Sequence, residues 1–229
     1  MAGFNPFGWR RTHIGGPDIP EPFEHQRREM VGTQLRARGI RDERVLEAMG
    51  KVPRHEFLPT PMRYAAYQDR ALPIGEGETI SQPYIVALTC QALQLEPGQH
   101  VLDVGSGTGY QTAVLVEMGC VVWGVEIDPE LAAASRARLE RLGYRGFEVR
   151  SGDGTLGWAE HAPFDAVAVA AAAPEVPPAL LRQMRDGGRL VAPLGDYDDQ
   201  MLVRVVRHGA DYERANLTPV RFVPLRFPG

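Results

Sequence analysis

Short apolar runs alternate with amphipathic stretches through the second half of the chain. Residues 101–104 are apolar except for Asp103, residues 107–118 show helical periodicity, and residues 121–125 are apolar again. Such alternation predicts a mainly parallel sheet with helices on both faces. The predicted strands are 101–104, 121–125, 147–150, 166–170 and 190–193, and the predicted helices between them are 107–118 and 129–142.

The pattern changes after residue 193. Two further strand-like runs, 201–207 and 220–223, have no helical pattern between them. Consecutive strands without a crossover helix pair antiparallel. We therefore predict an antiparallel pair at the C-terminal edge of the sheet.

The first half of the chain has a different pattern. Residues 1–22 are rich in glycine and proline and show no periodicity, which predicts an N-terminal tail. A helix is expected from Phe23 to a stop at Gly39, and a second helix over 42–49 with Gly50 closing it. Ser81-Gln82-Pro83 resembles a helix N-cap followed by proline in the first turn, which predicts a helix to about Leu95.

These patterns predict one domain over residues 23–229 after the tail. Its first part, 23–98, would form a helical cap and an active-site loop, and its second part, 99–229, the ligand-binding sheet. The 229 residues are 44% hydrophobic and 24% charged, which is typical of a globular protein that needs no disulfide or metal to form a core.

Charge and cysteine content exclude several classes of protein. The net charge of −4 argues against non-specific nucleic-acid binding. Cys90 and Cys120 stand alone in apolar surroundings, so no zinc site is expected, and lone thiols suit a reducing compartment. No apolar run is long enough to span a membrane, and Arg10-Arg11 is not followed by an apolar region typical of an export signal. We expect a cytoplasmic protein.

The most informative motif follows the first predicted strand and reads Asp103-Val104-Gly105-Ser106-Gly107-Thr108-Gly109. Glycines at this position allow a sharp strand-to-helix turn and close approach of a ligand to free backbone N–H groups. The dinucleotide fingerprint requires a small residue where Tyr110 stands, which argues against a dehydrogenase. An acidic residue followed by G-x-G-x-G is instead the pattern of S-adenosylmethionine methyltransferases.

Two more acidic residues follow strands. Glu126 lies 17 residues after Gly109 at the end of the second strand, where a carboxylate can accept both ribose hydroxyls. Asp153 follows the third strand, where it can accept a hydrogen bond from the adenine amino group. Because the carboxyl ends of parallel strands share one edge of a sheet, Asp103, Glu126 and Asp153 point to one cofactor site. The alternative is a glycine turn with acidic residues that only cap it.

A second block extends this pattern. Residues 72–87 read Leu-Pro-Ile-Gly-Glu-Gly-Glu-Thr-Ile-Ser-Gln-Pro-Tyr-Ile-Val-Ala. This block strongly resembles the protein-L-isoaspartate O-methyltransferase family. Five further segments share the resemblance: the glycine motif, 151–154, 171–174, Val52-Pro53-Arg54 and Arg221-Phe222-Val223-Pro224-Leu225. The resemblance runs from about Met30 to Leu225. Beyond it, many relatives carry a small or hydroxyl residue where this chain has Arg226.

The resemblance implies a Rossmann-like class I methyltransferase fold. Its seven-stranded, doubly wound and mostly parallel sheet would have the order 3-2-1-4-5-7-6, with strand 7 antiparallel. It also implies methylation of the α-carboxylate of L-isoaspartyl residues in damaged peptides and proteins by S-adenosylmethionine, with S-adenosylhomocysteine as product. The methyl ester then cyclises to a succinimide, and hydrolysis returns some normal aspartate.

The family's active-site serine corresponds to Ser81. The cofactor residues that the resemblance implies are Thr79, Ile80, Ser81, Gln82, Asp103, Gly105, Ser106, Gly107, Glu126, Ile127, Asp153 and Gly154. We expect no metal, no nucleic-acid partner and no membrane association. We expect the protein to be a monomer. Three alternatives stay open: Ser81 as a simple helix cap, a related carboxyl methyltransferase with another peptide acceptor, and a non-catalytic protein that binds S-adenosylmethionine.

Overall fold

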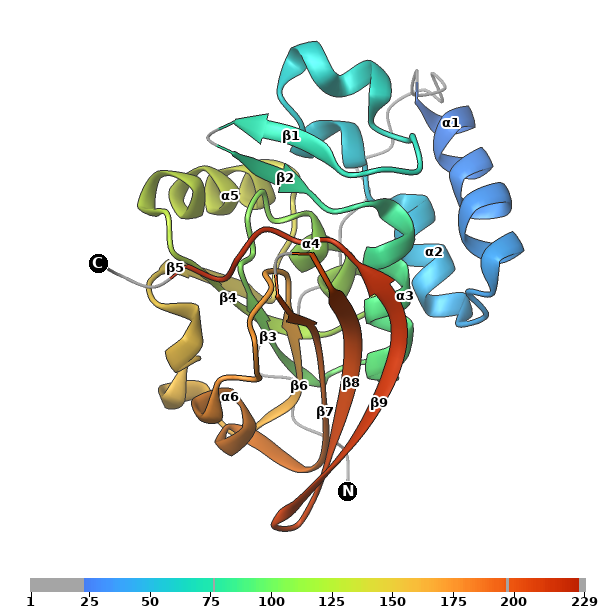
Figure 1. The fold of residues 1–229 in the computed structure, drawn as a ribbon. Coiled ribbons are helices and arrows are strands. Elements are labelled where there is room, and N and C mark those ends of the chain that lie inside the picture. Colours follow the sequence, from blue (N-terminus) through green and yellow to red (C-terminus); the bar gives the residue numbers. More distant parts are fainter. Residues whose placement is uncertain (1–22, 76, 197, 227–229) are drawn as a thin grey trace.

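A mixed seven-stranded sheet forms the centre of the molecule (Figure 1). The computed structural model describes residues 23–75, 77–196 and 198–226, so the predicted tail of residues 1–22 lies outside the described residues. The strand order is β5-β4-β3-β6-β7-β8-β9. The strands are β3 His100–Val104, β4 Val121–Glu126, β5 Phe147–Ser151, β6 Phe164–Val169, β7 Met184–Gly195, β8 Gln200–His208 and β9 Asp211–Val220.

Helices connect the parallel strands as the sequence predicts. They are α4 Tyr110–Glu117, α5 Pro129–Arg141 and α6 Pro178–Arg182. Helix α5 begins where the sequence suggests, because the Asp128 carboxylate accepts hydrogen bonds from the Glu130 and Leu131 amides and proline occupies the first helical position. Helix α6 was not predicted from the sequence.

Successive side chains of the central strands pack in two different hydrophobic cores, one on each face of the sheet. Val101 and Ala168 pack on the face covered by the N-terminal helices, α4 and α5. Leu102 and Val167, each next to a residue of the first core, pack on the opposite face with Leu180 of α6. Burial on both faces explains why these strands read as continuous apolar runs in the sequence.

The C-terminal strands correct the expected sheet order. The antiparallel pairing is confirmed, but β8 pairs with β7 and β9 forms the edge. The expected order 3-2-1-4-5-7-6 is therefore wrong, and the sixth strand of the sheet, rather than the seventh, runs against the parallel strands. Because β8 carries the buried Leu202, Val203 and Val205 while most side chains of β9 are exposed, the more apolar strand takes the inner position.

Several predicted bounds also change. The last strand ends at Val220, so the run 220–223 is not a strand. Strand β7 begins at Met184, six residues before the predicted strand 190–193, and its pairing with β6 is irregular between the pairs Phe164–Met184 and Ala166–Arg189.

The N-terminal part covers one face of the sheet with helices and a small hairpin. The helix expected from Phe23 is α1 Glu24–Glu29, continued by a π-helical segment Met30–Leu35 and a 3₁₀ turn Arg36–Arg38, and it ends at Gly39 as expected. The other elements are α2 Glu43–Lys51, 3₁₀ segments Arg54–Phe57 and Thr60–Ala65, hairpin strands β1 Leu72–Gly75 and β2 Glu78–Ile80, and α3 Pro83–Leu93. Helix α2 includes Gly50 instead of stopping at it. None of the described helices has the length and apolar character needed to cross a bilayer.

The turn between β3 and α4 requires glycine at residue 109. Gly109 has φ +85°, and a Cβ atom there would lie 2.5 Å from Ser135 Oγ and 3.1 Å from Leu139 Cδ1 of α5. The backbone conformation and the close approach of α5 therefore both exclude a side chain.

We predict that Gly109→Ala lowers the free energy of unfolding by about 2–4 kcal/mol, because left-handed strain and steric overlap add. Urea denaturation measures the loss. Gly98→Ala is the matched control, since Gly98 has φ +86° but a Cβ atom there would meet no other atom within 4 Å. Equal losses in the two variants would contradict the role assigned to the contact with α5.

Candidate active site

A cavity of about 510 Å³ opens at the carboxyl ends of β3, β4 and β6. The sheet order reverses between β3 and β6, because the chain continues from β3 toward β5 on one side and from β6 toward β7 on the other. Ligands of open α/β sheets bind at such a switch point. The main lining segments are 78–82 from strand β2 and the two residues after it, the glycine loop 105–108, Glu126 and Ile127 at the end of β4, Ala170 and Ala171 after β6, and the C-terminal stretch 219–226.

The glycine loop forms the floor of the cavity. Gly105, Gly107 and Gly109 all have positive φ angles, so the backbone turns sharply before α4. Arg138 Nη1 of α5 donates a 2.9 Å hydrogen bond to the Thr108 carbonyl oxygen and holds the loop from below. Gly105, Ser106 and Gly107, to which the resemblance assigns cofactor binding, line the cavity.

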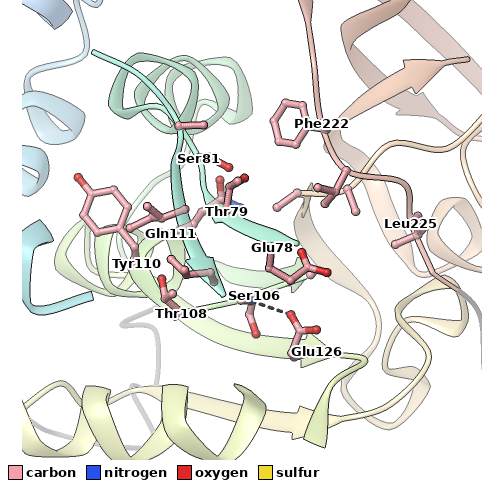
Figure 2. Close-up of a pocket in the computed structure, with 18 of the residues that line it drawn as sticks. Glu78, Thr79, Ser81, Ser106, Thr108, Tyr110, Gln111, Glu126, Phe222 and Leu225 are labelled. Atoms are coloured by element: carbon pink, nitrogen blue, oxygen red, sulfur yellow. Dashed lines mark hydrogen bonds between the residues drawn. The ribbon is translucent and has the colours of Figure 1, made fainter. Parts of the chain in front are cut away.

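Glu126 lies beside this loop with its carboxylate already oriented (Figure 2). Its Oε2 accepts a 2.8 Å hydrogen bond from the Gly107 amide, and its Oε1 accepts a 3.1 Å bond from the Asp128 amide. A carboxylate oxygen can accept more than one hydrogen bond, so ribose hydroxyls could still bind there. Ile127, the next lining residue, offers an apolar surface.

Asp103 is placed differently from the expectation. Its side chain has 0% exposure and does not line the cavity. Its Oδ2 accepts a 2.6 Å hydrogen bond from Thr112 Oγ1, and its Oδ1 accepts a 2.8 Å bond from Gln111 Nε2. Asp103 therefore fixes the first turn of α4 beneath the site, and Gln111, which does line the cavity, was missed by the sequence analysis.

Burial changes the titration of Asp103. Removal from water raises the pKa of this carboxyl to about 6, and the nearby Glu126 charge adds to the rise. The hydrogen bonds from Thr112 and Gln111 favour the ionised form and oppose this effect.

Asp153 also lies outside the lining, although its neighbour Gly154 belongs to it. Its Oδ1 accepts hydrogen bonds from the Thr155 amide and hydroxyl at 2.8 and 2.7 Å, which caps a short 3₁₀ turn. Gly154 has no room for a side chain, because a Cβ atom there would lie 2.6 Å from Val104 Cγ1. The contact between Asp153 and adenine stays a prediction.

Ser81 lies on the opposite wall, directly after β2. Thr79, Ile80 and Gln82 line the cavity with it. The predicted helix cap at Ser81 is wrong, because Pro83 takes the first helical position and Gln82 becomes the N-cap residue. Among the described residues, no hydrogen bond partner of the Ser81 hydroxyl is found, and Gln82 is held by its own bond to Asp69 Oδ1 at 2.8 Å.

The C-terminal stretch forms the remaining wall, where Phe222 and Leu225 lie near the cavity (Figure 2). The Ala172 amide donates to the Val223 carbonyl at 2.8 Å, and the Leu225 amide donates to the Ala172 carbonyl at 2.7 Å. These bonds attach the stretch to the loop after β6. The sequence singled out residues 221–225 only through the family resemblance.

Glu78 and Arg226 were also missed as lining residues. Arg226 Nη2 lies 2.6 Å from Glu78 Oε1. Partial burial raises the pKa of Glu78 and the charges of Glu126 and Asp128 add to the rise, whereas Arg226 lowers it. The charge on Arg226 therefore offsets part of the repulsion among the acidic groups here.

Tyr110 explains the departure from the dinucleotide fingerprint. Its ring is buried at the start of α4, 5.6 Å from the Phe57 ring, with the Arg54 guanidinium 4.7 Å above it. A small residue at this position would remove these ring contacts between the start of α4 and the segment that carries Arg54 and Phe57.

The cavity suits the cofactor that the sequence predicts. It combines the sharply turned backbone of a glycine loop, a carboxylate at the end of β4 and apolar lining from Ile127, Val125 and Leu131. No group of three or more His, Cys, Asp or Glu residues able to hold a metal occurs in the described part of the chain.

Comparison with known proteins gives consistent similarities. A family model described as protein-L-isoaspartate(D-aspartate) O-methyltransferase matches residues 25–227. A protein-L-isoaspartate O-methyltransferase of Synechococcus sp. (strain JA-2-3B'a(2-13)) is 47% identical over 97% of this chain and 98% of its own length. A protein-L-isoaspartate O-methyltransferase 2 of Anaeromyxobacter sp. (strain Fw109-5) is 52% identical over 90% of this chain and 85% of its own length.

Solved structures agree with the sequence relatives. A Plasmodium falciparum protein described as a protein-L-isoaspartate O-methyltransferase, in complex with S-adenosyl-L-homocysteine, matches with a TM-score of 0.75 and 27% identity over 87% of this chain and 98% of that one. Another structure described as protein-L-isoaspartate O-methyltransferase matches with a TM-score of 0.78 and 28% identity over 86% of this chain, which spans 65% of that longer chain.

The buried carboxyl generates a prediction about stability and pH. In the folded protein, Asp103 holds its proton up to about pH 6, whereas an unfolded carboxyl releases it near pH 4. Between these values the folded state binds more protons, so its stability falls as pH rises and levels off above pH 6. Relative to Asp103→Asn, the wild type should lose about 2–3 kcal/mol of unfolding free energy between pH 4 and pH 7.

Urea denaturation of both proteins across this range measures the difference. Asp211→Asn, which removes an exposed carboxylate on β9, controls for the loss of one acidic group. A difference between wild type and Asp103→Asn that stays constant or grows with pH would contradict the account of Asp103.

Proposed function

Because the chain belongs to the protein-L-isoaspartate(D-aspartate) O-methyltransferase family, we propose that this cavity is where it methylates L-isoaspartyl residues and that Ser81 holds the acceptor. The protein is an S-adenosylmethionine-dependent enzyme that transfers a methyl group to the α-carboxylate of such residues in damaged peptides and proteins. The ester then cyclises to a succinimide as the following backbone nitrogen attacks the ester carbonyl and methanol leaves, and hydrolysis of the succinimide returns some normal aspartate.

One observation supports this assignment of the site. The glycine loop with Glu126 and the loop with Ser81 form opposite walls of a single cavity. A methyl donor and a carboxylate acceptor must meet at short distance and in line. A cavity with a cofactor wall and a facing hydroxyl meets this requirement.

The acceptor needs positioning more than activation. A peptide carboxylate has a pKa near 4 and is ionised at neutral pH, so no general base has to remove a proton from it. The Ser81 hydroxyl can donate a hydrogen bond to one carboxylate oxygen while the other oxygen faces the methyl group. In this role Ser81 orients the acceptor and does not act as a covalent nucleophile.

The opposite wall binds the cofactor. When bound, S-adenosylmethionine supplies a methyl group on a sulfonium sulfur, and S-adenosylhomocysteine is left after transfer. Glu126 would accept hydrogen bonds from the ribose hydroxyls, Ile127 would pack against the adenine, and Gly105–Gly107 would offer backbone groups. Thr79, Ile80 and Gln82 would close the cavity from the hairpin side.

The isoaspartyl protein is the partner that this chemistry requires. A monomer without nucleic-acid partners and a cytoplasmic location stay predictions. Cys90 and Cys120, which are free and buried, support a reducing compartment.

Removal of the Ser81 hydroxyl tests its role. Ser81→Ala should reduce kcat/KM for an isoaspartyl peptide by about 10- to 100-fold, because a hydrogen bond to a charged group is lost. The affinity for S-adenosylhomocysteine, measured by calorimetry, should change less than about threefold, since Ser81 would hold the acceptor rather than the cofactor. Thr33→Ala, which removes an exposed hydroxyl bonded to the Glu29 carbonyl on the N-terminal helices, is the control. Unchanged turnover of Ser81→Ala would favour a different carboxyl acceptor or a different acceptor site.

The complementary change is Glu126→Gln. We expect the affinity for S-adenosylhomocysteine to fall at least about tenfold. The glutamine side chain would have one oxygen acceptor instead of two, so it could not accept hydrogen bonds from both ribose hydroxyls and from the Gly107 and Asp128 amides. Binding calorimetry measures the effect. An affinity equal to that of the wild type would refute the ribose contact.

A further inference from the structure

Two walls of the cavity, the hairpin wall with residues 78–82 and the C-terminal wall with residues 219–226, are held by separate parts of the fold. The hairpin wall is attached through Gln82, whose Nε2 donates to Asp69 at the N-terminal side. The C-terminal wall is attached through Gln200, whose side chain exchanges hydrogen bonds with the Phe222 backbone at 2.7 and 3.2 Å, and through the Ala172 bonds.

One side-chain pair connects these walls. Glu78 of β2 and Arg226 of the C-terminal stretch form an ion pair at 2.6 Å. Within residues 23–75, 77–196 and 198–226, it is the one ion pair or hydrogen bond between the β1–β2 hairpin and residues 221–226. Separation of these two side chains would therefore let the walls move apart without breaking any other polar contact between them.

The pair lies over the cofactor side of the cavity. Figure 2 shows Glu78 between the glycine loop with Glu126 and the stretch that carries Leu225. Both side chains line the cavity, with exposed fractions of 23% for Glu78 and 49% for Arg226. Glu126, the carboxylate assigned to ribose, lines the same cavity, and its negative charge raises the pKa of Glu78.

From this geometry we propose that Glu78 and Arg226 form an ionic strap that closes the cavity over the bound cofactor and must open before the product leaves. The proposal rests on the proposed function only for the identity of the cofactor. Two consequences follow. The strap slows dissociation of S-adenosylhomocysteine, and it keeps the Ser81 wall at a fixed separation from the Val223–Leu225 wall.

Salt should weaken the strap. Both side chains are partly exposed, and the screening length falls from about 30 Å at 0.01 M salt to about 3 Å at 1 M. Dissociation of S-adenosylhomocysteine from the wild type should therefore become faster as salt rises. A protein without the pair should release it at a rate that depends much less on salt.

A double-mutant cycle with Glu78→Gln, Arg226→Gln and the double variant tests the strap. Stopped-flow displacement of S-adenosylhomocysteine by excess S-adenosylmethionine gives the dissociation rate without any methyl acceptor. Each single variant should dissociate about fivefold faster than the wild type, which corresponds to about 1 kcal/mol. The double variant should be no faster than the singles, and the charge-reversed protein Glu78→Arg/Arg226→Glu should recover part of the slow release.

Arg36→Gln provides the matched control. Arg36 forms a two-bond ion pair with Glu43 at 2.7 and 2.8 Å on the N-terminal helices, away from the cavity lining, and its loss should leave the dissociation rate unchanged. Wild-type rates in the Glu78 and Arg226 variants, or strictly additive effects in the double variant, would overturn the strap while leaving the proposed function intact. Failure of the wild type to bind S-adenosylhomocysteine would instead overturn the proposed function, and the strap with it.

Discussion

A buried carboxylate at the end of β3 is the constraint on which the site depends. Asp103 accepts hydrogen bonds from Gln111 and Thr112 and so fixes where α4 begins. The intervening chain turns through glycines with positive φ angles, and the missing side chain of Gly109 lets α5 pack against this turn. The glycine loop and the Glu126 carboxylate, which accepts from the Gly107 amide, line the cavity beside this turn. The family's cofactor chemistry thus starts from a residue that never touches the cavity.

The architecture could be predicted from the sequence because local patterns determine it. Continuous apolar runs of the central strands report burial on two faces, and Asp128 with Pro129 mark the start of α5. The resemblance gave the wrong order of the last strands, because that order depends on whether β8 or β9 pairs with β7. The physical signal was nevertheless present. Residues 201–207 are more apolar than 211–220, and an interior strand must be covered on both faces.

The candidate site was predicted in part, for reasons that differ by residue. Glu126 and the glycine loop follow from strand ends, because parallel strands place those ends together. Asp103 and Asp153 lie at strand ends, but their hydrogen bonds to Thr112 and Thr155 stabilise the local structure. The sequence pattern alone does not distinguish such a structural acidic residue from one that binds a ligand. Glu78 and Arg226 come from segments far apart in sequence, so only the folded chain brings them together.

Together these features describe a cavity in which one wall holds a methyl donor and the other holds a carboxylate that needs orientation. The most direct test of this account compares two synthetic peptides of identical sequence, one with an isoaspartyl residue and one with normal aspartate. Methyl transfer from labelled S-adenosylmethionine to each peptide is followed with the wild-type protein. The account predicts transfer to the isoaspartyl peptide alone. Transfer to both peptides, or to the aspartyl peptide alone, would contradict it.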